Sequence, residues 1–373
     1  MRTFSLLAIS LTVSLLFSET QARNVHDISE CPPLKPRRSP PKDVTDLRID
    51  DIKVIASLGD STMAGFGLQE IIDGTTPLDA LEIRGKNYAT GGDPGAKSLA
   101  RFTTNYQPEL KGASVGQIVV TRCNYDYCAL SDYNPDVDRL NGAKSGAIAK
   151  RIKDELDYVI PYMKEYPGVD FENDWKLIIL HIGNNDQCDS CTVRGNESTP
   201  EVYGSYIDTA IERISQNIPK AIVTLVGNLN VSTLYNLASR HPEYCPTEDA
   251  TINYLTPKVE CPCLSSPELM LGMDAVVAEY NKRLIKIAEK YKAKKGSNFA
   301  VVYQPAGIDF RGFPINYLSP LDCFHPSIHA QEYFAKILWN SLFRPSIKKQ
   351  KVFEYDENLA IYCPKNSDRI STK

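Results

Sequence analysis

The sequence predicts an α/β fold in which helices cover both faces of a mostly parallel sheet. Short apolar runs without polar alternation indicate strands that are buried on both sides. Longer segments with apolar residues at helical spacing lie between these runs, and glycine-rich polar turns end them. Because strands that alternate with long helices build parallel sheets, we expect a three-layer α/β/α sandwich.

The N-terminus has the pattern of a secretory signal peptide over residues 1–22. One positive charge precedes an apolar run from Phe4 to Phe17, which is too short to span a bilayer comfortably. Thr20-Gln21-Ala22 then supplies a cleavage site of small residues. The glycosylation sequons at Asn196 and Asn230 agree with passage through the secretory route.

Strands and helices alternate through the rest of the chain. A proline-rich basic arm over residues 23–50, expected to be extended, precedes one domain over 51–345 and an extension over 346–373. The predicted strands are Lys53–Leu58, Gln117–Arg122, Lys176–Ile182, Ala221–Val226 and Phe299–Gln304. The predicted helices are Gly142–Tyr166, Val202–Asn217, Pro267–Lys295 and Ser327–Phe343.

The charge balance gives the chain no general preference for nucleic acid. The sequence has 42 Lys and Arg against 46 Asp and Glu, which gives a formal net charge of −4. Binding to a phosphate backbone requires a basic surface, so we expect no nucleic-acid partner. We interpret a basic cluster near the C-terminus as solvated surface, with contact to anionic lipid headgroups as the alternative. Its members are Arg344, Lys348, Lys349 and Lys351.

Ten cysteines, all beyond the predicted signal peptide, indicate an oxidising compartment and allow up to five disulfides. Spacing does not fix their pairing. Zinc is an alternative for the Cys188-x-x-Cys191 and Cys261-x-Cys263 motifs, although secretion favours disulfides. The spacings that suggest pairs are Cys123 with Cys128, Cys188 with Cys191, and Cys245 with Cys261 or Cys263.

The first predicted strand ends in a tight turn that carries a serine. Its apolar run stops at Gly59-Asp60-Ser61, and small residues then lead into a predicted helix start. Open α/β sheets place their ligands at the carboxyl ends of the strands, and a helix N-terminus there favours negative charge on the serine oxygen. Gly, Asp and Ser are also ordinary turn residues, so the assignment of Ser61 as a nucleophile depends on partners elsewhere.

His325 is the histidine best placed to act as the base that a serine nucleophile requires. It lies at the end of an irregular stretch, just before the last predicted helix. Asp322 precedes it by three residues, and a turn of that length can fold the carboxylate back onto the imidazole, as a triad requires. The alternatives are an ordinary Asp-initiated turn or a metal site with His329, for which no third ligand is evident.

Two glycine-containing loops offer donors for the oxyanion of a tetrahedral intermediate. Gly91-Gly92-Asp93 lets a backbone N–H approach a substrate closely, and the loop that contains Asn185 leaves a predicted strand at its carboxyl end. We therefore expect the Gly92 N–H and the Asn185 amide to point at the same oxygen. Each loop alone would be ordinary turn chemistry.

Together these four blocks resemble the GDSL or SGNH hydrolases in content and in order. The resemblance is closer to the phospholipase B branch and extends from Asp51 to Pro364. It implies a flavodoxin-like three-layer fold and hydrolysis of lipid esters without a metal or another cofactor. The segments that carry it are Gly91-Gly92-Asp93, Gly183 to Cys188, the Cys245 to Cys263 insertion, Asp322 to His325, and Tyr362-Cys363-Pro364.

The resemblance also implies a role for each matching residue. Ser61 matches the nucleophile, His325 the general base and acid, and Asp322 the carboxylate that orients it. Gly92 and Asn185, with the Ser61 backbone N–H, match the oxyanion hole. Membrane-bound members of the branch carry a C-terminal anchor. This chain ends in polar residues, so the resemblance implies a secreted protein without a transmembrane anchor.

Three functions are compatible with these residues. The first is a phospholipase or lysophospholipase that releases fatty acid from glycerophospholipids and contacts a lipid surface transiently. The second is a secreted esterase of acetylated sugars or other small esters, because a triad does not choose the acyl chain and fold does not settle function. The third is a non-enzymatic binding protein on the same scaffold, against which the intact Ser61, Asn185, Asp322 and His325 argue.

Overall fold

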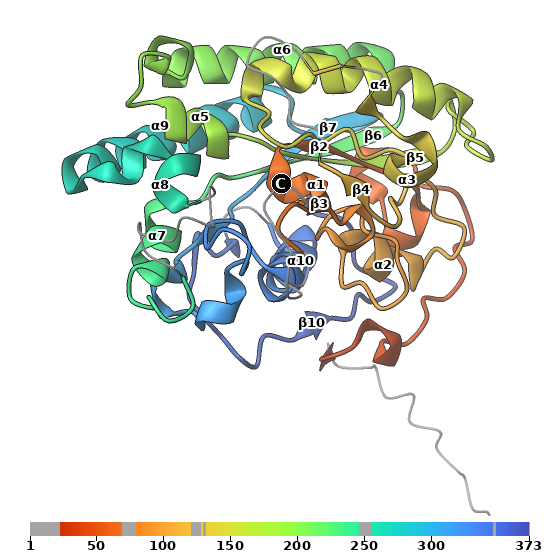
Figure 1. The fold of residues 1–373 in the computed structure, drawn as a ribbon. Helices are drawn as coiled ribbons and strands as arrows, with labels where there is room; N and C mark the ends of the chain where they lie inside the picture. Colours follow the sequence, from red (N-terminus) through yellow and green to blue (C-terminus); the bar gives the residue numbers. More distant parts are fainter. Residues whose placement is uncertain are drawn as a thin grey trace, which may run out of the picture.

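A parallel four-stranded sheet lies at the centre of the residues that the structure describes (Figure 1). The computed structural model describes residues 23–68, 80–120, 128–129, 132–245, 256–345 and 348–372. The sheet has the order β2-β5-β6-β7, and every neighbouring pair is parallel. The predicted strands other than Gln117–Arg122 are thus confirmed. They are β2 (Ile52–Gly59), β5 (Trp175–His181), β6 (Ala221–Val226) and β7 (Phe299–Gln304).

Helices cover both faces of this sheet, which confirms the expected three-layer α/β/α class (Figure 1). One face is covered by α4 (Ile152–Glu165), α6 (Pro200–Asn217) and α9 (Pro267–Lys290). The other face is covered by α10 (Ile328–Leu342), with α2 (Leu99–Thr104) beside it.

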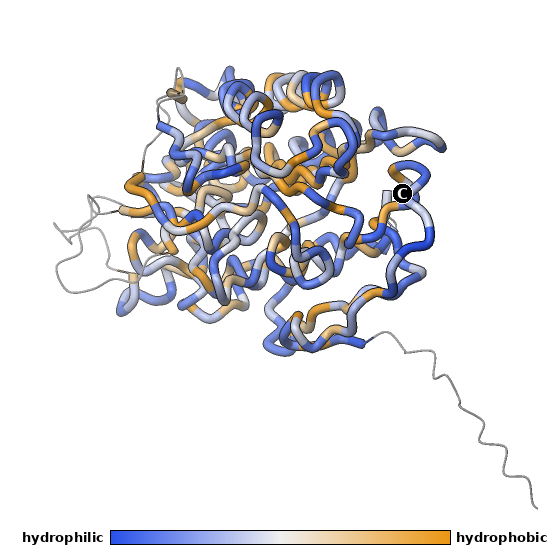
Figure 2. Tube along the Cα trace, turned by 90° about the vertical axis from the view of Figure 1, so that its right-hand side faces the viewer, coloured by the Kyte–Doolittle hydropathy of each residue, from blue (hydrophilic) through white to orange (hydrophobic). Residues whose placement is uncertain are grey.

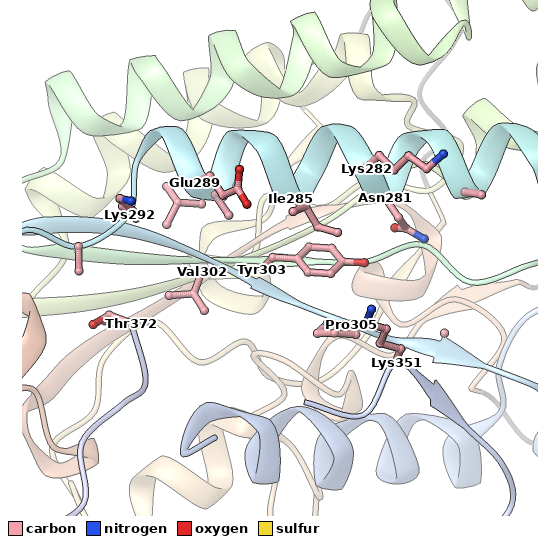
Figure 3. Close-up of a pocket in the computed structure, with 15 residues that line it drawn as sticks. Asn281, Lys282, Ile285, Glu289, Lys292, Val302, Tyr303, Pro305, Lys351 and Thr372 are labelled. Carbon is pink, nitrogen blue, oxygen red and sulfur yellow. The ribbon is translucent and has the colours of Figure 1, made fainter. Parts of the chain in front are cut away.

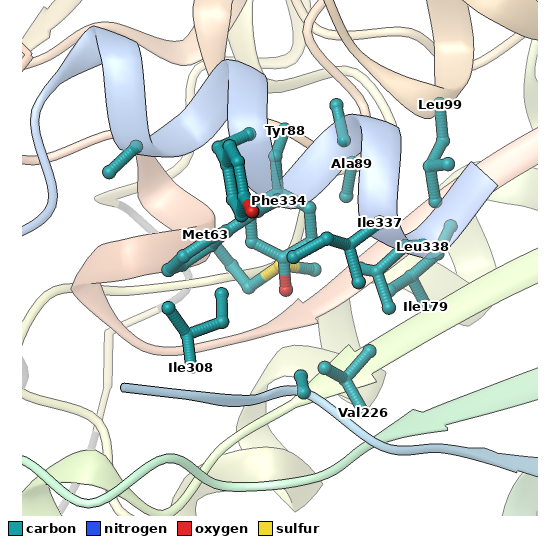
Figure 4. Packing of buried hydrophobic residues seen from close by; sticks show 14 of the residues in the cluster. Met63, Tyr88, Ala89, Leu99, Ile179, Val226, Ile308, Phe334, Ile337 and Leu338 are labelled. Carbon is teal, nitrogen blue, oxygen red and sulfur yellow. The ribbon is translucent and has the colours of Figure 1, made fainter. Parts of the chain in front are cut away.

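The sheet divides the apolar core into two layers. Because successive side chains of a strand point to opposite faces, alternate residues pack against different helices. Leu58 and Leu225 belong to the cluster that contains α4, α6 and α9 side chains. Ile179 and Val226 belong to the cluster on the other face, where they lie below Phe334 of α10 (Figure 4). Figure 2 shows the apolar residues gathered in the interior and hydrophilic residues along much of the periphery.

Local capping explains where two of the long helices begin. Thr199 accepts a hydrogen bond from Val202 N and is followed by proline, and α6 starts there. Ser266 caps α9 in the same way by accepting from Leu269 N, again followed by proline. The starts of α6, α9 and α10 lie within two residues of their predicted limits, and α9 ends five residues early, at Lys290.

The predicted helix Gly142–Tyr166 is wrong in its first part. Residues 142–148 form a loop, a 3₁₀ turn follows over Ala149–Arg151, and α4 begins at Ile152. Gly146 has φ +78°, in the left-handed region that a right-handed helix does not accommodate. The loop instead runs along the end of β2, where Lys144 N donates to the Gly59 carbonyl oxygen at 3.1 Å.

The predicted strand Gln117–Arg122 is not part of the central sheet. Its described part is β4 (Ile118–Val119), which pairs antiparallel with β3 (Leu81–Glu82) in a separate two-stranded sheet. Val119 is 65% exposed, so the segment is not the buried strand that its apolar residues suggested. Residues 121–122 lie outside the described residues.

Short elements complete the described fold. The short helices are α1 (Ser61–Ala64), α3 (Pro135–Asp138), α5 (Asn184–Asp189), α7 (Ser232–Ala238) and α8 (Pro257–Glu260). The short strands are β1 (Asn24–Val25), β8 (Gly307–Ile308), β9 (Val352–Phe353) and β10 (Ile361–Tyr362). β1 pairs with β10 and β8 pairs with β9.

Disulfides join loops that are far apart in the sequence. The expected local pair Cys188–Cys191 is wrong, and Cys245 pairs with neither of the cysteines expected for it. α5 packs against the 3₁₀ turn Pro262–Ser265, which brings the cysteines near its end to those beside the turn. Because these four sulfurs are bonded in pairs, the zinc alternative fails. The described bonds are Cys31–Cys363, Cys188–Cys261, Cys191–Cys263 and Cys245–Cys323.

The remaining predicted pair and the chain ends are described only in part. Cys128 is disulfide-bonded, whereas Cys123 and the predicted signal peptide lie outside the described residues. The basic arm is tied to the C-terminal extension by the pairing of β1 with β10 and by Cys31–Cys363. Among the helices of the described residues, none has both the length and the apolar character that crossing a bilayer demands.

Candidate active site

The three side chains predicted as a catalytic triad lie in hydrogen-bond contact at the carboxyl edge of the sheet. Ser61 Oγ is 2.7 Å from His325 Nε2, and His325 Nδ1 is 2.6 Å from Asp322 Oδ2. A carboxylate only accepts hydrogen bonds, so Nδ1 carries the proton and Nε2 accepts from the Ser61 hydroxyl. Residues 264 positions apart in the chain thus meet in an arrangement that can activate a serine.

Ser61 lies in a tight turn between the end of β2 and the short helix α1. Position 59 requires glycine because the neighbouring strand lies very close. A Cβ there would lie 2.2 Å from the His181 carbonyl oxygen of that strand. Asp60 caps α1 by accepting from Thr62 N at 3.0 Å. The turn places Ser61 beside the loop that follows β5.

The loop that carries His325 holds it in a fixed relation to Asp322. Asp322 Oδ1 accepts from the backbone N–H groups of Phe324 and His325, each at 2.9 Å, while Oδ2 contacts the imidazole. Cys323 has φ +54°, a left-handed conformation that is unfavourable for a residue with a side chain. The disulfide from Cys323 to Cys245 covalently attaches this loop to the segment after α7.

The electrostatics of the pair favour an ionised Asp322 and a basic His325. Burial raises the pKa of Asp322. The charge of His325 and the hydrogen bonds lower it by more than burial raises it, so the pKa of Asp322 lies below its ordinary value. Burial lowers the pKa of His325, but the Asp322 carboxylate raises it more, so the net pKa lies above 6.5. Glu260, at the end of α8, also raises the pKa of His325.

Aromatic rings form an apolar wall beside the imidazole. The Phe66 ring meets the His325 ring edge-on with centroids 4.5 Å apart, and the Phe324 ring lies at 5.3 Å. Both phenylalanines are buried, so they keep water away from one side of His325. Gly67 allows this close approach, because a Cβ there would lie 3.0 Å from the His325 Cβ.

Asp60 and Asn184 connect the serine turn to the loop after β5, a link that sequence analysis missed. Asn184 Nδ2 donates to Asp60 Oδ2 at 3.0 Å, while the other carboxylate oxygen caps α1. Burial raises the pKa of Asp60 to about 6, against the hydrogen bond from Thr62 and the charge of His325, which lower it. The available signal was an acidic residue directly before the serine in a turn that the fold buries.

Asn185 lies at the same edge, in the first turn of α5. Its Nδ2 donates to the Ala147 carbonyl oxygen at 2.8 Å, which fixes the plane of the amide. A primary amide carries two N–H donors, so one remains for a ligand. Asn185 and the loop that contains Ala147 therefore form one wall of the site.

Gly92 does not join this group, contrary to expectation. Its N–H donates to the Ser114 carbonyl oxygen at 2.7 Å, as part of a backbone pairing between Gly91 and Ser114. A Cβ at Gly92 would lie 3.0 Å from Ala113 and from the Ser114 oxygen, so glycine serves the close packing of two backbone segments. The N–H that sequence analysis assigned to the oxyanion is thus already bonded.

The loop over residues 144–147 takes the position that the Gly92 loop was expected to fill. Lys144 N bonds the end of β2, Ala147 N donates to Lys144 O at 3.1 Å, and Ala147 O accepts from Asn185. Gly146 is the third residue of this turn and is exposed. The signal in the sequence was a run of mostly small residues, Gly142 to Ala147, that fits a loop as well as a helix.

A buried carboxylate holds the loop over residues 144–147 in place. Ser145 donates to Glu82 Oε1 from both its backbone N and its hydroxyl, at 3.2 and 2.6 Å. Glu82 in turn pairs with the buried Arg84, whose Nε lies 3.1 Å from Asp138 Oδ1. The loop is thus attached through Glu82 to a group of buried, ion-paired side chains.

Two other histidines, His181 and His329, do not contribute to the site. His181 is buried, its Nδ1 lies 2.7 Å from the Tyr88 hydroxyl, and burial lowers its pKa to about 4. The His329 ring packs 5.9 Å from the Tyr317 ring. Over the ranges described above, no cluster of three or more His, Cys, Asp or Glu side chains is arranged to hold a metal ion.

The chain is similar to a family model and to curated relatives over most of its length. The model described as GDSL-like Lipase/Acylhydrolase matches residues 55–338. "Phospholipase B1, membrane-associated" is 29% identical over 350 residues in Rattus norvegicus and 30% identical over 356 residues in Homo sapiens. These alignments cover 90% of this chain and 22% of each relative, so the chain spans only a small part of their length.

A solved carbohydrate esterase structure also aligns with this chain. The alignment covers 77% of this chain and 66% of the esterase, with a TM-score of 0.32 and 12% sequence identity. A likeness at this level adds nothing to the assignment.

Proposed function

Because the chain belongs to the GDSL-like lipase/acylhydrolase family, we propose that it hydrolyses carboxylic esters through Ser61 and releases fatty acid from glycerophospholipids. The observation that carries this proposal is the hydrogen-bonded chain from Ser61 through His325 to Asp322, with links of 2.7 and 2.6 Å. The reaction would be that of a phospholipase A, a lysophospholipase or both. Such a substrate implies transient contact with a lipid surface.

The proposed reaction is an acyl transfer in two steps. His325 Nε2 takes the proton of the Ser61 hydroxyl as Oγ attacks the ester carbonyl carbon, and Asp322 stabilises the imidazolium that forms. When the tetrahedral intermediate collapses, His325 gives the proton to the departing alcohol and the acyl group stays on Ser61. Water then attacks the acyl ester by the same proton transfers and releases the fatty acid.

Three donors are proposed for the oxyanion of the tetrahedral intermediate. They are the backbone N–H of Ser61, the second amide hydrogen of Asn185 and the backbone N–H of Gly146 in place of that of Gly92. Support for Gly146 comes from its exposed position in the turn that lies between the end of β2 and Asn185. Donors fixed in this way cost little reorganisation when charge develops, which is how they lower the barrier.

Exposed apolar side chains on α8, on α9 and after α5 support a lipid rather than a small ester. Val193 follows α5, Val259 lies in α8 and Leu271 lies in the first turns of α9, and they are 100%, 63% and 71% exposed. The disulfide between Cys191 and Cys263 holds the segments that carry them. Contact with a lipid surface would bury such side chains, and the relatives named above are described as membrane-associated phospholipases.

The substrate class is tested by comparing two kinds of ester with the same protein preparation. We expect release of fatty acid from phosphatidylcholine and lysophosphatidylcholine, together with some hydrolysis of a soluble chromogenic acetate. Mass spectrometry of the released acids measures the first reaction and absorbance measures the second. Hydrolysis of the acetate without any release of fatty acid would make a small-ester esterase the better assignment. Failure of an organophosphate probe to label Ser61 would favour a non-enzymatic binding protein.

The pKa of His325 predicts the acid limb of the pH profile. The imidazole must be neutral to act as a base, so kcat/KM falls as pH drops through its pKa. Because Asp322 raises this pKa, the midpoint should lie above 6.5 for a soluble ester. In Asp322→Asn the raising charge is lost, so the midpoint should move to lower pH. A wild-type midpoint below 6.5, or one that Asp322→Asn leaves in place, would contradict this assignment.

We also propose that the protein is secreted. The signal-peptide pattern and four described disulfides support an oxidising compartment. Of the two sequons, Asn196 is exposed in the 3₁₀ turn Gly195–Glu197 and Asn230 is half-buried. Recovery of protein from the culture medium of expressing cells, with a mobility change after glycosidase treatment, tests both statements.

A further inference from the structure

A groove of about 670 Å³ lies between α9 and the outer edge of β7, at the opposite side of the sheet from the serine strand. β7 is the last strand of the order β2-β5-β6-β7, so the groove and Ser61 are separated by the width of the sheet. None of the residues that line it contacts the triad. The groove therefore has no part in the hydrolysis proposed above.

Apolar side chains form much of the walls of the groove. Ala278, Ile285 and Ala288 of α9 form one wall, and Val302 and Pro305 lie across from them (Figure 3). Ala278 is exposed and Ile285 is 39% exposed, so water fills a space that apolar side chains line. An apolar ligand would gain free energy by displacing this water.

The groove is elongated, and its charges lie toward the ends. Lys282 and Lys351 lie near one end, and Lys292 lies near the other together with Glu289 (Figure 3). Asn281 and Lys292 are eleven residues apart on α9, which corresponds to roughly 16 Å at the rise of an α-helix. This length suits an extended chain of about a dozen carbon atoms better than a compact ring system.

The position of the acidic groups decides which end favours an anion. Glu289 lies beside Lys292 and disfavours a second negative charge at that end. Lys282 Nζ is bonded to Glu279 Oε1 at 2.5 Å, whereas Lys351, as far as the described residues show, has no carboxylate partner. Lys351 is therefore the cation best placed to receive a carboxylate from a ligand.

A peptide strand is a poorer occupant of this edge. Strand addition needs unpaired backbone groups on β7, and two that would serve are already bonded. Val301 N donates to the Tyr291 carbonyl oxygen at 3.1 Å, and Tyr303 O accepts from Lys349 Nζ at 3.0 Å. What the groove offers to a ligand is thus its side chains, which are apolar in the middle and include lysines toward the ends.

We propose that this groove binds a long-chain fatty acid, with the acyl chain along α9 and β7 and the carboxylate at Lys351. The choice of a fatty acid among apolar anions rests partly on the proposed function, which releases one. The groove itself is independent of that reaction. Binding would keep a molecule of product, or of free fatty acid from another source, at a site apart from the serine.

The proposal is tested by titrating the Ser61→Ala protein with saturated fatty acids below their micelle concentrations. Calorimetry should give one site, with a Kd that falls about fourfold for each methylene from octanoate to dodecanoate and then changes less. Hexadecanol, which lacks the carboxylate, should bind at least tenfold more weakly than hexadecanoate. Equal binding of the acid and the alcohol would overturn the role of Lys351.

Matched variants on the same helix and strand locate the site. Ile285→Asp puts a charge in the apolar wall, Ala278→Trp fills one end, and Lys351→Glu reverses the charge, so each should weaken hexadecanoate binding at least tenfold. Lys286→Glu is the control, because Lys286 is exposed on α9 but does not line the groove. Circular dichroism checks that every variant is folded. Undiminished binding in Ile285→Asp and Ala278→Trp would overturn the proposal.

These titrations separate the two proposals of function and binding. A Ser61→Ala protein cannot turn over substrate, so binding is measured without catalysis. If hexadecanoate binds in the groove while the wild-type protein releases no fatty acid from phospholipid, only the proposed function fails. If phospholipid is hydrolysed and hexadecanoate does not bind, only the groove proposal fails.

Discussion

Ser61→Ala is expected to lower kcat for ester hydrolysis by roughly 10⁴-fold or more. Without Oγ no acyl-enzyme can form, and His325 Nε2 loses the group that it would deprotonate. The fold should survive, because the change removes one hydroxyl from a turn and should alter the free energy of unfolding by no more than about 1 kcal/mol. Rates of fatty-acid release, followed beside thermal unfolding of both proteins, give the two quantities.

Ser57→Ala is the matched control for this variant. Ser57 is buried four residues earlier in β2, and its hydroxyl bonds to Thr90 Oγ1 at 2.9 Å, away from the triad. It should keep wild-type turnover at some cost in stability. If Ser61→Ala turned over substrate as fast as Ser57→Ala, Ser61 would not be the nucleophile.

Asn185→Ala is expected to lower kcat by about 10²- to 10³-fold with a smaller change in KM. The amide hydrogen that faces the site would stabilise charge that is present only in the transition state, so its loss should appear in kcat. The same substitution breaks the bond to the Ala147 carbonyl oxygen, which could also shift the Gly146 turn. Steady-state kinetics with a soluble ester measure the effect without an interface.

Asn185→Asp tests whether negative charge develops beside this side chain, although it also loses the bond to the Ala147 carbonyl oxygen. The aspartate has the same shape but donates no hydrogen bond when ionised, and its charge would repel the developing oxyanion. We therefore expect a loss at least as large as that in Asn185→Ala. A protein with Asp at this position that keeps most of its activity would show that Asn185 is not an oxyanion donor.

The sheet and long helices were predictable because their signals are local. Apolar runs such as Ala221–Val226 are buried on both faces, and the strand that formed has the predicted limits. The caps at Thr199 and Ser266 likewise carry their information within four residues. Such elements depend little on what the rest of the chain does.

The pairings that the sequence did not reveal depend on which segments meet in space. Gly92 and Gly146 both lie in small-residue turns, and only the backbone pairing with Ser114 shows that the Gly92 N–H is occupied. Reading residues 142–148 as helix removed Gly146 from consideration. The spacing of Cys188 and Cys191 suggested a local pair, and spacing carries no information about the turn that α5 packs against.

The contact of Ser61 with His325 and Asp322 could be predicted. The positions of these residues in the chain and the chemistry of their side chains both indicate a triad. A turn after the first strand and a turn before the last helix both fall at the carboxyl edge of a parallel sheet. The contribution of Asp60 could not be anticipated in the same way, because it depends on burial and on Asn184, which comes 124 residues later.

We expect the bond between Cys245 and Cys323 to be needed before His325 and Asp322 take their final positions. Cys323, which has φ +54°, lies between Asp322 and His325. Its disulfide to Cys245 therefore stabilises an unfavourable backbone conformation in a loop outside the sheet. Before this disulfide forms, we expect a folded protein of low activity. The rate at which a fluorophosphonate labels Ser61 should then be low, and it should rise when the two thiols are oxidised. Labelling that is equally fast in the reduced protein would refute this. If the reduced protein is labelled slowly, formation of this disulfide is the step that completes the site.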